Sequence, residues 1–186
     1  DESNTIVLFR ETLEGSNTLD IFDIGTKQLR FSTSDNYVPQ SPRISPLGKD
    51  IVFGCMDGKI YSMDVDGGAI TPLVDKEGMK SGFGEWSADG ATLCFSSYKD
   101  SQTPPNIYTV DANSGEITQH TNCSQCIDRF PQISPCGRFI LFTRQHLDEP
   151  DMPKQAILLD IATRKIVQLP QREGTNYEID RGCWSG

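Results

Sequence analysis

Residues 43–54 read RISPLGKDIVFG. Residues 85–96 (EWSADGATLCFS) and 132–143 (QISPCGRFILFT) repeat the same plan: a serine, a short turn, a glycine and then a hydrophobic run. Self-similarity at a fixed spacing is the sequence signature of repeat architectures. These copies therefore decide the fold class before any other feature of the chain is considered.

Two marks in the sequence keep the same slowly drifting period. The serine of the opening motif recurs at intervals of 42, 47 and 51 residues, and an aspartate that ends a later apolar run recurs at intervals of 41, 47 and 49. The serines are Ser45, Ser87, Ser134 and Ser185, and the aspartates are Asp23, Asp64, Asp111 and Asp160. Because two independent marks stay in phase, we infer a structural unit that repeats every 40–50 residues.

Each unit reads as four short β-strands. The first strand ends at the serine, a glycine turn follows, and the second strand is rich in β-branched and aromatic residues, as in DIVFG at 50–54. A variable loop leads to a third strand that ends at the aligned aspartate, and a polar turn leads to the fourth. No segment keeps an apolar period of 3.6 residues, so helix should be nearly absent. The pattern predicts an all-β fold, a β-propeller of four-stranded antiparallel blades.

We expect one propeller domain over residues 1–186, with about four blades. The N-terminal stretch NTIVLFRE is a second strand without a first, and the C-terminal stretch EIDRGCWSG is a first strand without a second, so the two should complete one blade together. The expected blades are a composite of 1–38 with 176–186, followed by 39–80, 81–124 and 125–175. Three alternatives stay open: a closed four-bladed ring, part of a larger ring through self-association, or a fragment of a longer chain.

Composition restricts the class of partner. The net charge is −9, the isoelectric point is about 4.6 and the mean hydropathy is −0.42. A nucleic-acid surface needs clustered Lys and Arg, and no apolar run approaches the roughly 20 residues of a membrane helix. We therefore expect neither nucleic acid nor membrane insertion. Because the chain starts at Asp1 without Met, it is compatible with processing or with excision from something longer.

Six cysteines leave the redox state open. Cys123 and Cys126 form a CSQC pair, which is compatible with a loop disulfide, with unpaired thiols or with half of a zinc site. Cys94 alternates with Leu93 and Phe95 inside a strand and is expected to be a small buried hydrophobe.

The repeat resembles the TolB-type, WD-like propeller family, whose unit is close to SPDGxxIxFxSxxxGxxxIYxxDxxGGxxxxLT. Residues 45–74 (SPLGKDIVFGCMDGKIYSMDVDGGAITPLV) follow it nearly throughout, and residues 87–121 follow it with a longer central loop. Residues 134–170 are looser, with Cys136 in place of the usual Asp, and residues 4–33 are degenerate. The resemblance implies the fold. It does not imply one function, because the same repeat builds periplasmic scaffolds, gating propellers of serine peptidases and some polysaccharide lyases.

The longest loops of the chain are expected on one face of the propeller. The loops between second and third strands, YKDSQTPPN at 98–106 and RQHLDEPDMPKQ at 144–155, are longer than CMDGK at 55–59. Long loops on a rigid scaffold often carry binding residues, although tolerated insertions would look the same.

Two copies of Ile-Asp-Arg precede first strands. Asp128 and Arg129 stand in one copy, Asp180 and Arg181 in the other, and Arg43 lies nearer its own serine. These charges either ring the channel mouth, where a guanidinium can bind a carboxylate, or pair between neighbouring blades as structural clasps. Trp86, Tyr177, His146 and Asp148 complete the candidate set for a ligand or partner.

Catalytic patterns are weak. Of the two histidines, His120 is expected at the surface of a fourth strand, and His146 lies in the long loop beside Asp148, Glu149 and Asp151. That loop could bind a divalent cation, but solvated acidic loops are common. There is no GxSxG elbow, phosphate-binding glycine loop or DxDxDG calcium loop. We predict no cofactor, no bound metal and no catalytic residue, and we leave open whether the chain is an enzyme.

These features favour a non-catalytic binding or scaffold propeller that presents its loop-rich face, at the channel mouth, to a protein, a peptide or a small ligand. The alternative is the propeller portion of a larger hydrolase or polysaccharide lyase. We also expect that the chain can form a homodimer. The compartment is expected to be periplasmic or extracellular, with the cytoplasm as the alternative.

Overall fold

The computed structural model describes residues 5–11, 17–33, 37, 39–100, 102–170 and 184 of the chain. All regular structure in these residues is β-strand, as predicted, and none of it is a helix of the length and apolarity that a membrane span requires. The strands form four antiparallel sheets in chain order.

The first sheet contains β1 (Thr5–Glu11), β2 (Asn17–Asp23) and β3 (Gln28–Ser32). The second contains β4 (Pro39–Ile44), β5 (Asp50–Cys55), β6 (Ile60–Asp64) and β7 (Thr71–Val74). The third contains β8 (Lys80–Trp86), β9 (Thr92–Tyr98), β10 (Asn106–Asp111) and β11 (Ile117–Gln119). The fourth contains β12 (Cys126–Ile133), β13 (Phe139–His146), β14 (Gln155–Asp160) and β15 (Ile166–Gln168).

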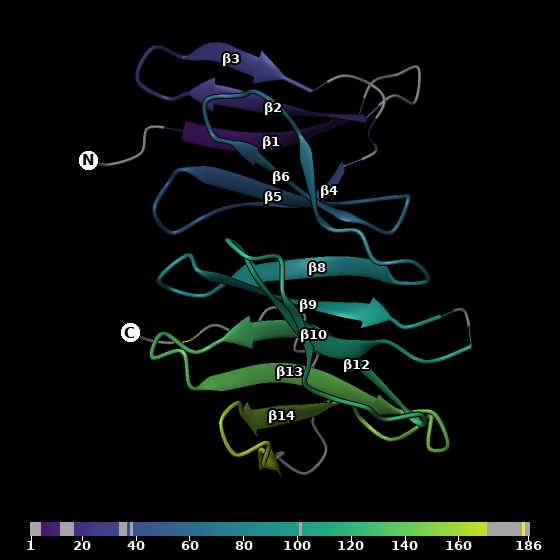
Figure 1. The fold of residues 1–186 in the computed structure, drawn as a ribbon. Helices are drawn as coiled ribbons and strands as arrows, with labels where there is room; N and C mark the ends of the chain where they lie inside the picture. Colours follow the sequence, from purple (N-terminus) through teal and green to yellow (C-terminus); the bar gives the residue numbers. More distant parts are fainter. Residues whose placement is uncertain are drawn as a thin grey trace.

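The sheets stack face to face like consecutive blades, with the first and fourth at opposite ends of the stack (Figure 1). The first strands of successive four-stranded sheets contact one another, β4 with β8 and β8 with β12. Each of these first strands also packs on the second strand of the sheet before it. The first strands therefore share an inner edge, where the first strands of a propeller line its channel.

The first sheet contains the second, third and fourth strands of a blade. Its β1 contacts β4 just as β5 contacts β8, and its β2 ends at the aligned Asp23. The innermost edge of this sheet is thus the free edge of β1 among the described residues. The expected partner strand falls in 176–186, which lies outside the described residues apart from Trp184.

The repeated serine closes the turn between first and second strands. In the fourth sheet, the amide of Ser134 donates to the carbonyl of Phe139 (2.8 Å), and the amide of Phe139 donates to Ser134 Oγ (3.0 Å). The intervening Gly137 has φ of +70°, in the region that favours glycine. Ser45 and Ser87 make the equivalent bonds in the second and third sheets. The serine and glycine of the motif therefore form the same hydrogen-bonded turn in all three sheets.

The repeated aspartate closes the turn between third and fourth strands. Asp111 Oδ1 accepts hydrogen bonds from the amides of Asn113 (3.0 Å) and Ser114 (2.7 Å). Asp160 accepts in the same way from Ala162 and Thr163, and Asp23 from Thr26. A carboxylate that accepts backbone amides two and three residues ahead forms an Asx turn, which explains why this position repeats.

Three apolar clusters lie between consecutive sheets. The first includes Leu19 and Ile21 against Ile51 and Phe53. The cluster between the second and third sheets includes Val52, Trp86, Phe95 and Tyr108, and the cluster between the third and fourth includes Cys94, Ile107, Ile140 and Phe142. The prediction that Cys94 is a small buried hydrophobe is confirmed: it is 0% exposed, and burial raises the pKa of its thiol to about 12.

Each first strand also carries a bulge that the repeat pattern did not predict. The register shifts between Gln40 and Arg43, between Gly82 and Glu85, and between Arg129 and Gln132. The three bulges lie at equivalent distances before the repeated serine. A bulge bends a strand and re-aims its side chains, so the three inner strands share one local geometry.

Candidate functional site

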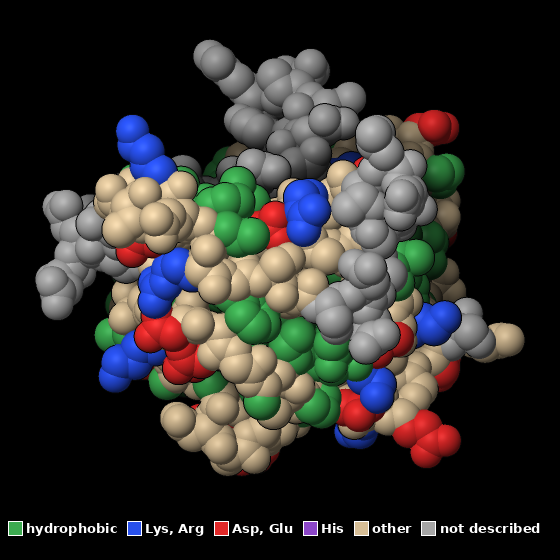
Figure 2. Space-filling model, turned by 90° about the horizontal axis from the view of Figure 1, so that it is seen from above, with side chains coloured by type: hydrophobic (Ala, Val, Ile, Leu, Met, Phe, Trp, Pro, Cys, Tyr) green, Lys and Arg blue, Asp and Glu red, His purple; other side chains and the backbone are tan. Residues whose placement is uncertain are grey.

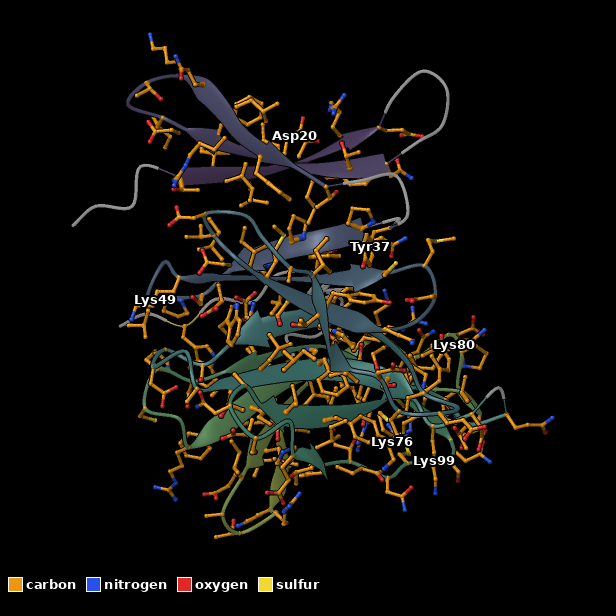
Figure 3. The ribbon with its side chains drawn as sticks, turned by 45° about the horizontal axis from the view of Figure 1, so that its top comes forward. Asp20, Tyr37, Lys49, Lys76, Lys80 and Lys99 are labelled. Carbon is orange, nitrogen blue, oxygen red and sulfur yellow. A yellow bond between two sulfur atoms is a disulfide. The ribbon has the colours of Figure 1, made fainter. Side chains whose placement is uncertain are left out.

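The connections of the sheets fall on two opposite faces. We call loop face the side with the connections 56–59, 99–105 and 147–154 and the inter-sheet connections 75–79 and 120–125. We call turn face the side with the serine and aspartate turns. Figure 3 shows Lys76, Lys80 and Lys99 together on the loop face and Lys49 on the turn face. The long loops expected to carry a binding surface are thus on one face, together with the starts of β4, β8 and β12.

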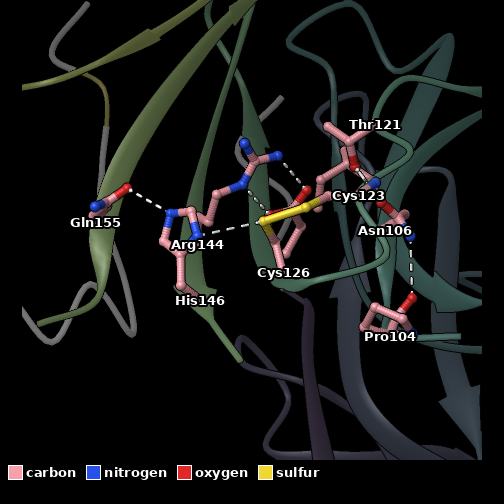
Figure 4. Close-up of a disulfide and its surroundings, with 10 residues drawn as sticks. Pro104, Asn106, Thr121, Cys123, Cys126, Arg144, His146 and Gln155 are labelled. Atoms are coloured by element: carbon pink, nitrogen blue, oxygen red, sulfur yellow. Dashed lines mark hydrogen bonds and ion pairs between the residues drawn. A yellow bond between two sulfur atoms is a disulfide. The ribbon is translucent and has the colours of Figure 1, made fainter. Parts of the chain in front are cut away.

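A disulfide fastens the loop face between the third and fourth sheets. Cys123 and Cys126 are bonded, with Cα atoms 5.3 Å apart. Asn106, at the start of β10, accepts hydrogen bonds from the amide of Cys123 (2.8 Å) and the hydroxyl of Thr121 (3.1 Å), and its Nδ2 donates to the carbonyl of Pro104 (3.1 Å). Figure 4 shows this arrangement. The connection 120–125 is therefore anchored at both ends.

Asp128 is part of a buried ion pair. Its Oδ1 lies 2.7 Å from Arg144 Nε and its Oδ2 lies 2.8 Å from Arg144 Nη2, and the aspartate side chain is 0% exposed. The two residues face each other in the register of β12 and β13. A bidentate guanidinium satisfies both carboxylate oxygens, which a buried carboxylate requires. The partner of Asp128 thus belongs to its own sheet and not, as the clasp hypothesis supposed, to a neighbouring blade.

Arg129 and Arg43 contact the neighbouring sheet. Arg129 Nη2 donates to the hydroxyl of Tyr98 in the third sheet (2.9 Å). Arg43 Nε donates to Glu85 Oε2, also in the third sheet (3.1 Å). Both contacts join consecutive sheets, which is the geometry of a clasp.

Trp86 lies in the core. It is 7% exposed, packs between the second and third sheets, and its Nε1 donates to the carbonyl of Arg43 (3.5 Å). It ends β8 at the turn face, away from the loops. Its position favours a packing role over contact with a ligand at the channel mouth.

His146 and Asp148 do not meet. His146 Nδ1 is 3.8 Å from Cys126 Sγ, and its Nε2 is 3.4 Å from Gln155 Oε1, so the ring lies on the disulfide (Figure 4). Asp148 is exposed in the following loop. Among the residues that the structure describes, no three His, Cys, Asp or Glu side chains form a group that could hold a metal ion. Tyr177, Asp180 and Arg181, the remaining candidates, lie outside the described residues.

The expectation of a surface position for His120 is wrong. The side chain is partly buried between the third and fourth sheets, where burial and the nearby Arg164 lower its pKa from 6.5 to about 4. Its Nε2 is 2.8 Å from Thr109 Oγ1, and its Nδ1 is 3.0 Å from Arg164 Nη1. Alignment of the repeats contains the missed signal, because His120 follows Asp111 at the distance at which the partly buried Leu73 follows Asp64.

Three lysines on the loop face are exposed. No ion pair joins Lys76, Lys80 or Lys99 to a described residue. Asp148, Glu149 and Asp151 are exposed on the same face, in the loop of the fourth sheet. The loop face thus combines exposed cations beside the third sheet with exposed carboxylates beside the fourth, a surface that can pair with opposite charges on a partner.

Stacked four-stranded sheets, inner first strands and a loop-bearing face define the chain as a β-propeller. The chain belongs to the TolB beta propeller domain family, whose model matches residues 5–177. A curated relative, an uncharacterized protein of Agrobacterium fabrum, is 34% identical over 137 residues, which are 72% of this chain and 43% of the relative. The resemblance noted in the repeats is therefore confirmed.

Solved structures show the same fold. The putative TolB of Agrobacterium tumefaciens matches with a TM-score of 0.67 and 21% identity, over 89% of this chain and 60% of that one. An oligogalacturonate lyase in complex with manganese matches with a TM-score of 0.65 and 16% identity, over 86% of this chain and 43% of that one. The chain thus spans less than half the length of the curated relative and 60% of the first of these structures.

Proposed function

We propose that this chain is a non-catalytic propeller domain that binds a protein or peptide on its loop face. The observation that carries the proposal is that some charged side chains on this face are paired within the protein, whereas others are exposed and have no ion pair to a described residue. Asp128 and Arg144 form a buried ion pair, and Arg129 bonds Tyr98 of the neighbouring sheet. Lys76, Lys80 and Lys99, in contrast, are exposed without an ion pair to a described residue.

The anchored connections support this proposal. The disulfide, the Asn106 hydrogen bonds and the bond from the amide of Asp128 to the carbonyl of Pro105 (2.9 Å) hold the base of both long loops. A preorganised surface loses less conformational entropy when it binds a partner.

A panning experiment tests the proposal. Peptides selected from a phage-displayed random library against the purified chain are synthesised, and their affinity is measured by biolayer interferometry. We expect the loop-face variant K80A/K99A to bind selected peptides at least about tenfold more weakly, and the turn-face variant K49A to bind them unchanged. Equal loss in both variants, or loss in K49A alone, would refute the assignment to the loop face.

The alternative proposal is that the chain is the propeller portion of a larger hydrolase or polysaccharide lyase. Its support is the coverage of only 43% of both the curated relative and the lyase structure. The test is an assay of oligogalacturonate cleavage with and without Mn²⁺, using this chain beside the longest natural form that contains it. Cleavage that depends on the longer form would favour this alternative over a pure binding domain.

We propose a periplasmic or extracellular location, supported by the Cys123–Cys126 disulfide, because disulfides persist in oxidising compartments. Maleimide labelling of protein taken from its native compartment, followed by mass spectrometry, tests it. Cys123 and Cys126 should label only after reduction, while the exposed Cys136 should label before it. Labelling of all three without reduction would favour the cytoplasm.

A further inference from the structure

Two cavities open on the turn face at equivalent places in the repeat. One lies between the second and third sheets and has a volume of about 280 Å³, and the other lies between the third and fourth sheets and has a volume of about 320 Å³. Ser62 lines the first and Thr109 the second, each two residues before the aligned aspartate. The smaller cavity is therefore an internal reference for the larger one.

Two residues distinguish the larger cavity from its equivalent. Nine residues after the aligned aspartate, the smaller cavity has Leu73 and the larger has His120. Four residues after the aspartate of the next sheet, Arg164 lines the larger cavity, whereas the equivalent residue Gly115 does not line the smaller one. The larger cavity thus has a histidine and a guanidinium that the smaller cavity lacks.

The backbone at Arg164 is unfavourable for an arginine. Its φ is +61°, and the same turn position is occupied by Lys27, Gly68 and Gly115, with φ of +58°, +136° and +72°. A left-handed conformation is readily adopted by glycine and disfavoured for residues with a Cβ. Because Lys27 adopts the same conformation in the first sheet, the strain belongs to the repeated turn and is not specific to this cavity.

His120 orients the guanidinium. Arg164 Nη1 donates to the carbonyl of Gln119 (2.9 Å) and to His120 Nδ1 (3.0 Å), so His120 Nδ1 is an acceptor and the ring proton lies on Nε2. That Nε2 then donates to Thr109 Oγ1 (2.8 Å). A neutral ring is consistent with the lowered pKa of His120. The Nε–Nη2 edge of Arg164 keeps its donors free of any described partner, and this edge fits a carboxylate bidentately.

Other residues of the larger cavity give it a second polar group and apolar surface. Asp89 uses Oδ1 to accept from the Ser87 hydroxyl (2.5 Å) and the Ala91 amide (3.0 Å), which leaves Oδ2 without a described partner. Ile133 and Ile161 supply apolar surface. Asp89 lines both cavities, so it does not distinguish them. The cavity volume is at the lower end of the range of ligand pockets.

We propose that the cavity between the third and fourth sheets is a binding site for a small carboxylate that also carries a hydrogen-bond donor, as amino acids and hydroxy acids do. The ligand carboxylate binds the free edge of Arg164, which His120 and Thr109 hold in place. Asp89 accepts from the ammonium or hydroxyl of the ligand, and the carbon chain packs on Ile133 and Ile161. The site lies on the face opposite the loops and is independent of the function proposed for the loop face.

Chemical-shift mapping tests the site with four probes of equal chain length. The amide spectrum of the full chain is recorded with L-threonine, 3-hydroxybutyrate, butyrate and L-threoninamide at millimolar concentration. We expect threonine, hydroxybutyrate or both to shift the amides of Ile133, Gly137 and Ile161, and to leave those of Leu73 and Ala112 at the smaller cavity unmoved. Comparison of the two distinguishes an ammonium donor from a hydroxyl donor. Butyrate should bind more weakly, and threoninamide, which lacks the carboxylate, should not bind.

The matched variants convert the larger cavity into its equivalent. R164G and H120L install the residues that the chain itself uses at these positions, so both should fold, and R164G also relieves the left-handed arginine. We expect R164G to weaken binding at least about tenfold, with the remaining amide shifts of the free protein unchanged. The proposal is overturned if no probe shifts these amides, if the smaller cavity responds equally, or if R164G binds as well as the wild type.

Discussion

His120 and Leu73 show how one position of a repeat can be used in two ways. Both follow the third strand at the same distance, and both are partly buried between sheets. Leucine there only adds apolar contact, whereas His120 needs Thr109 and Arg164 to satisfy its ring nitrogens. Burying a neutral imidazole also makes the fold sensitive to acid, because the protonated ring would face a guanidinium 3.0 Å away.

The free energy of unfolding should decrease as the pH is lowered, because of His120. Its folded-state pKa of about 4 is below the ordinary 6.5, so the unfolded chain takes up a proton first as the pH falls. Stability is therefore lost between about pH 6.5 and pH 4, on the order of 1–2 kcal/mol between pH 7 and pH 5. We expect H120L to remove this part of the dependence, measured as the difference in urea unfolding free energy between the two pH values. An unchanged slope in H120L would show that other groups set it.

Substitution of Asp128 should lower the free energy of unfolding more than most single substitutions do. Its carboxylate is fully buried against Arg144, so D128A leaves a guanidinium of 14% exposure unpaired and should cost about 3–5 kcal/mol of unfolding free energy. R43A, which breaks a half-exposed pair with Glu85, is the control and should cost about 0–1 kcal/mol. Urea unfolding of both variants checks this, and equal losses would contradict the structural role of Asp128.

At the scale of the element, the turns are specified more strongly than the strands. The serine and aspartate turns are closed by the same side-chain to backbone hydrogen bonds in successive sheets, whatever strands they join. The strands vary in sequence and need only β-forming residues that pack between sheets. The loops vary most, since they pack on little, and the exposed charges of the loop face lie there.

Glycine in the serine turn should be needed for its backbone alone. Gly137 has φ of +70°, and a Cβ there would meet no atom within 4 Å, so G137A should cost about 1–2 kcal/mol through backbone strain only. Gly82 is also surrounded by open space but lacks a positive φ, so G82A is the matched control and should change stability by less than about 0.5 kcal/mol. Thermal unfolding of the two variants measures the difference. If G82A lost as much stability as G137A, the loss could not be assigned to the positive φ of Gly137.

On the scale of the whole molecule, the first-sheet end of the stack is unlike its middle. In the register of the sheets, Ile6 and Leu8 of the first sheet correspond to Ile51 and Phe53 of the second. The latter are 0% and 1% exposed against the first sheet, while Ile6 and Leu8 are 41% and 49% exposed. Figure 2, which looks onto this end, shows hydrophobic side chains at the surface among charged ones. This face is thus built like the faces that another blade covers.

Self-association should follow from that exposed end. We expect light scattering on a size-exclusion column to give a mass above 20.7 kDa that rises with concentration, because contiguous apolar surface favours association. The variant I6S/L8S should shift the chain toward the monomer, and L47S, which changes an exposed leucine of a serine turn, is the control. A strictly monomeric wild type would show that the chain covers this face itself.

We propose that residues 176–186 supply the missing innermost strand of the first sheet, which would make a composite blade of both chain ends. The support is the strand order β1–β2–β3, in which β1 occupies the place of a second strand. Removal of residues 176–186 should then lower the melting temperature by several degrees. A truncated chain that melts with the full-length protein would exclude the composite blade.

The sequence by itself determined the repeat, the all-β class, the four sheets and the turn residues, because turn geometry and strand alternation are local properties of the chain. It also indicated the buried role of Cys94, since strand alternation predicts burial. Only the tertiary structure decided that Asp128 pairs with Arg144, that Trp86 is a core residue, and that His120 bonds Thr109 and Arg164. Those facts depend on the register of paired strands and on how one sheet packs on the next. Such contacts join residues distant along the chain, and no local pattern records them.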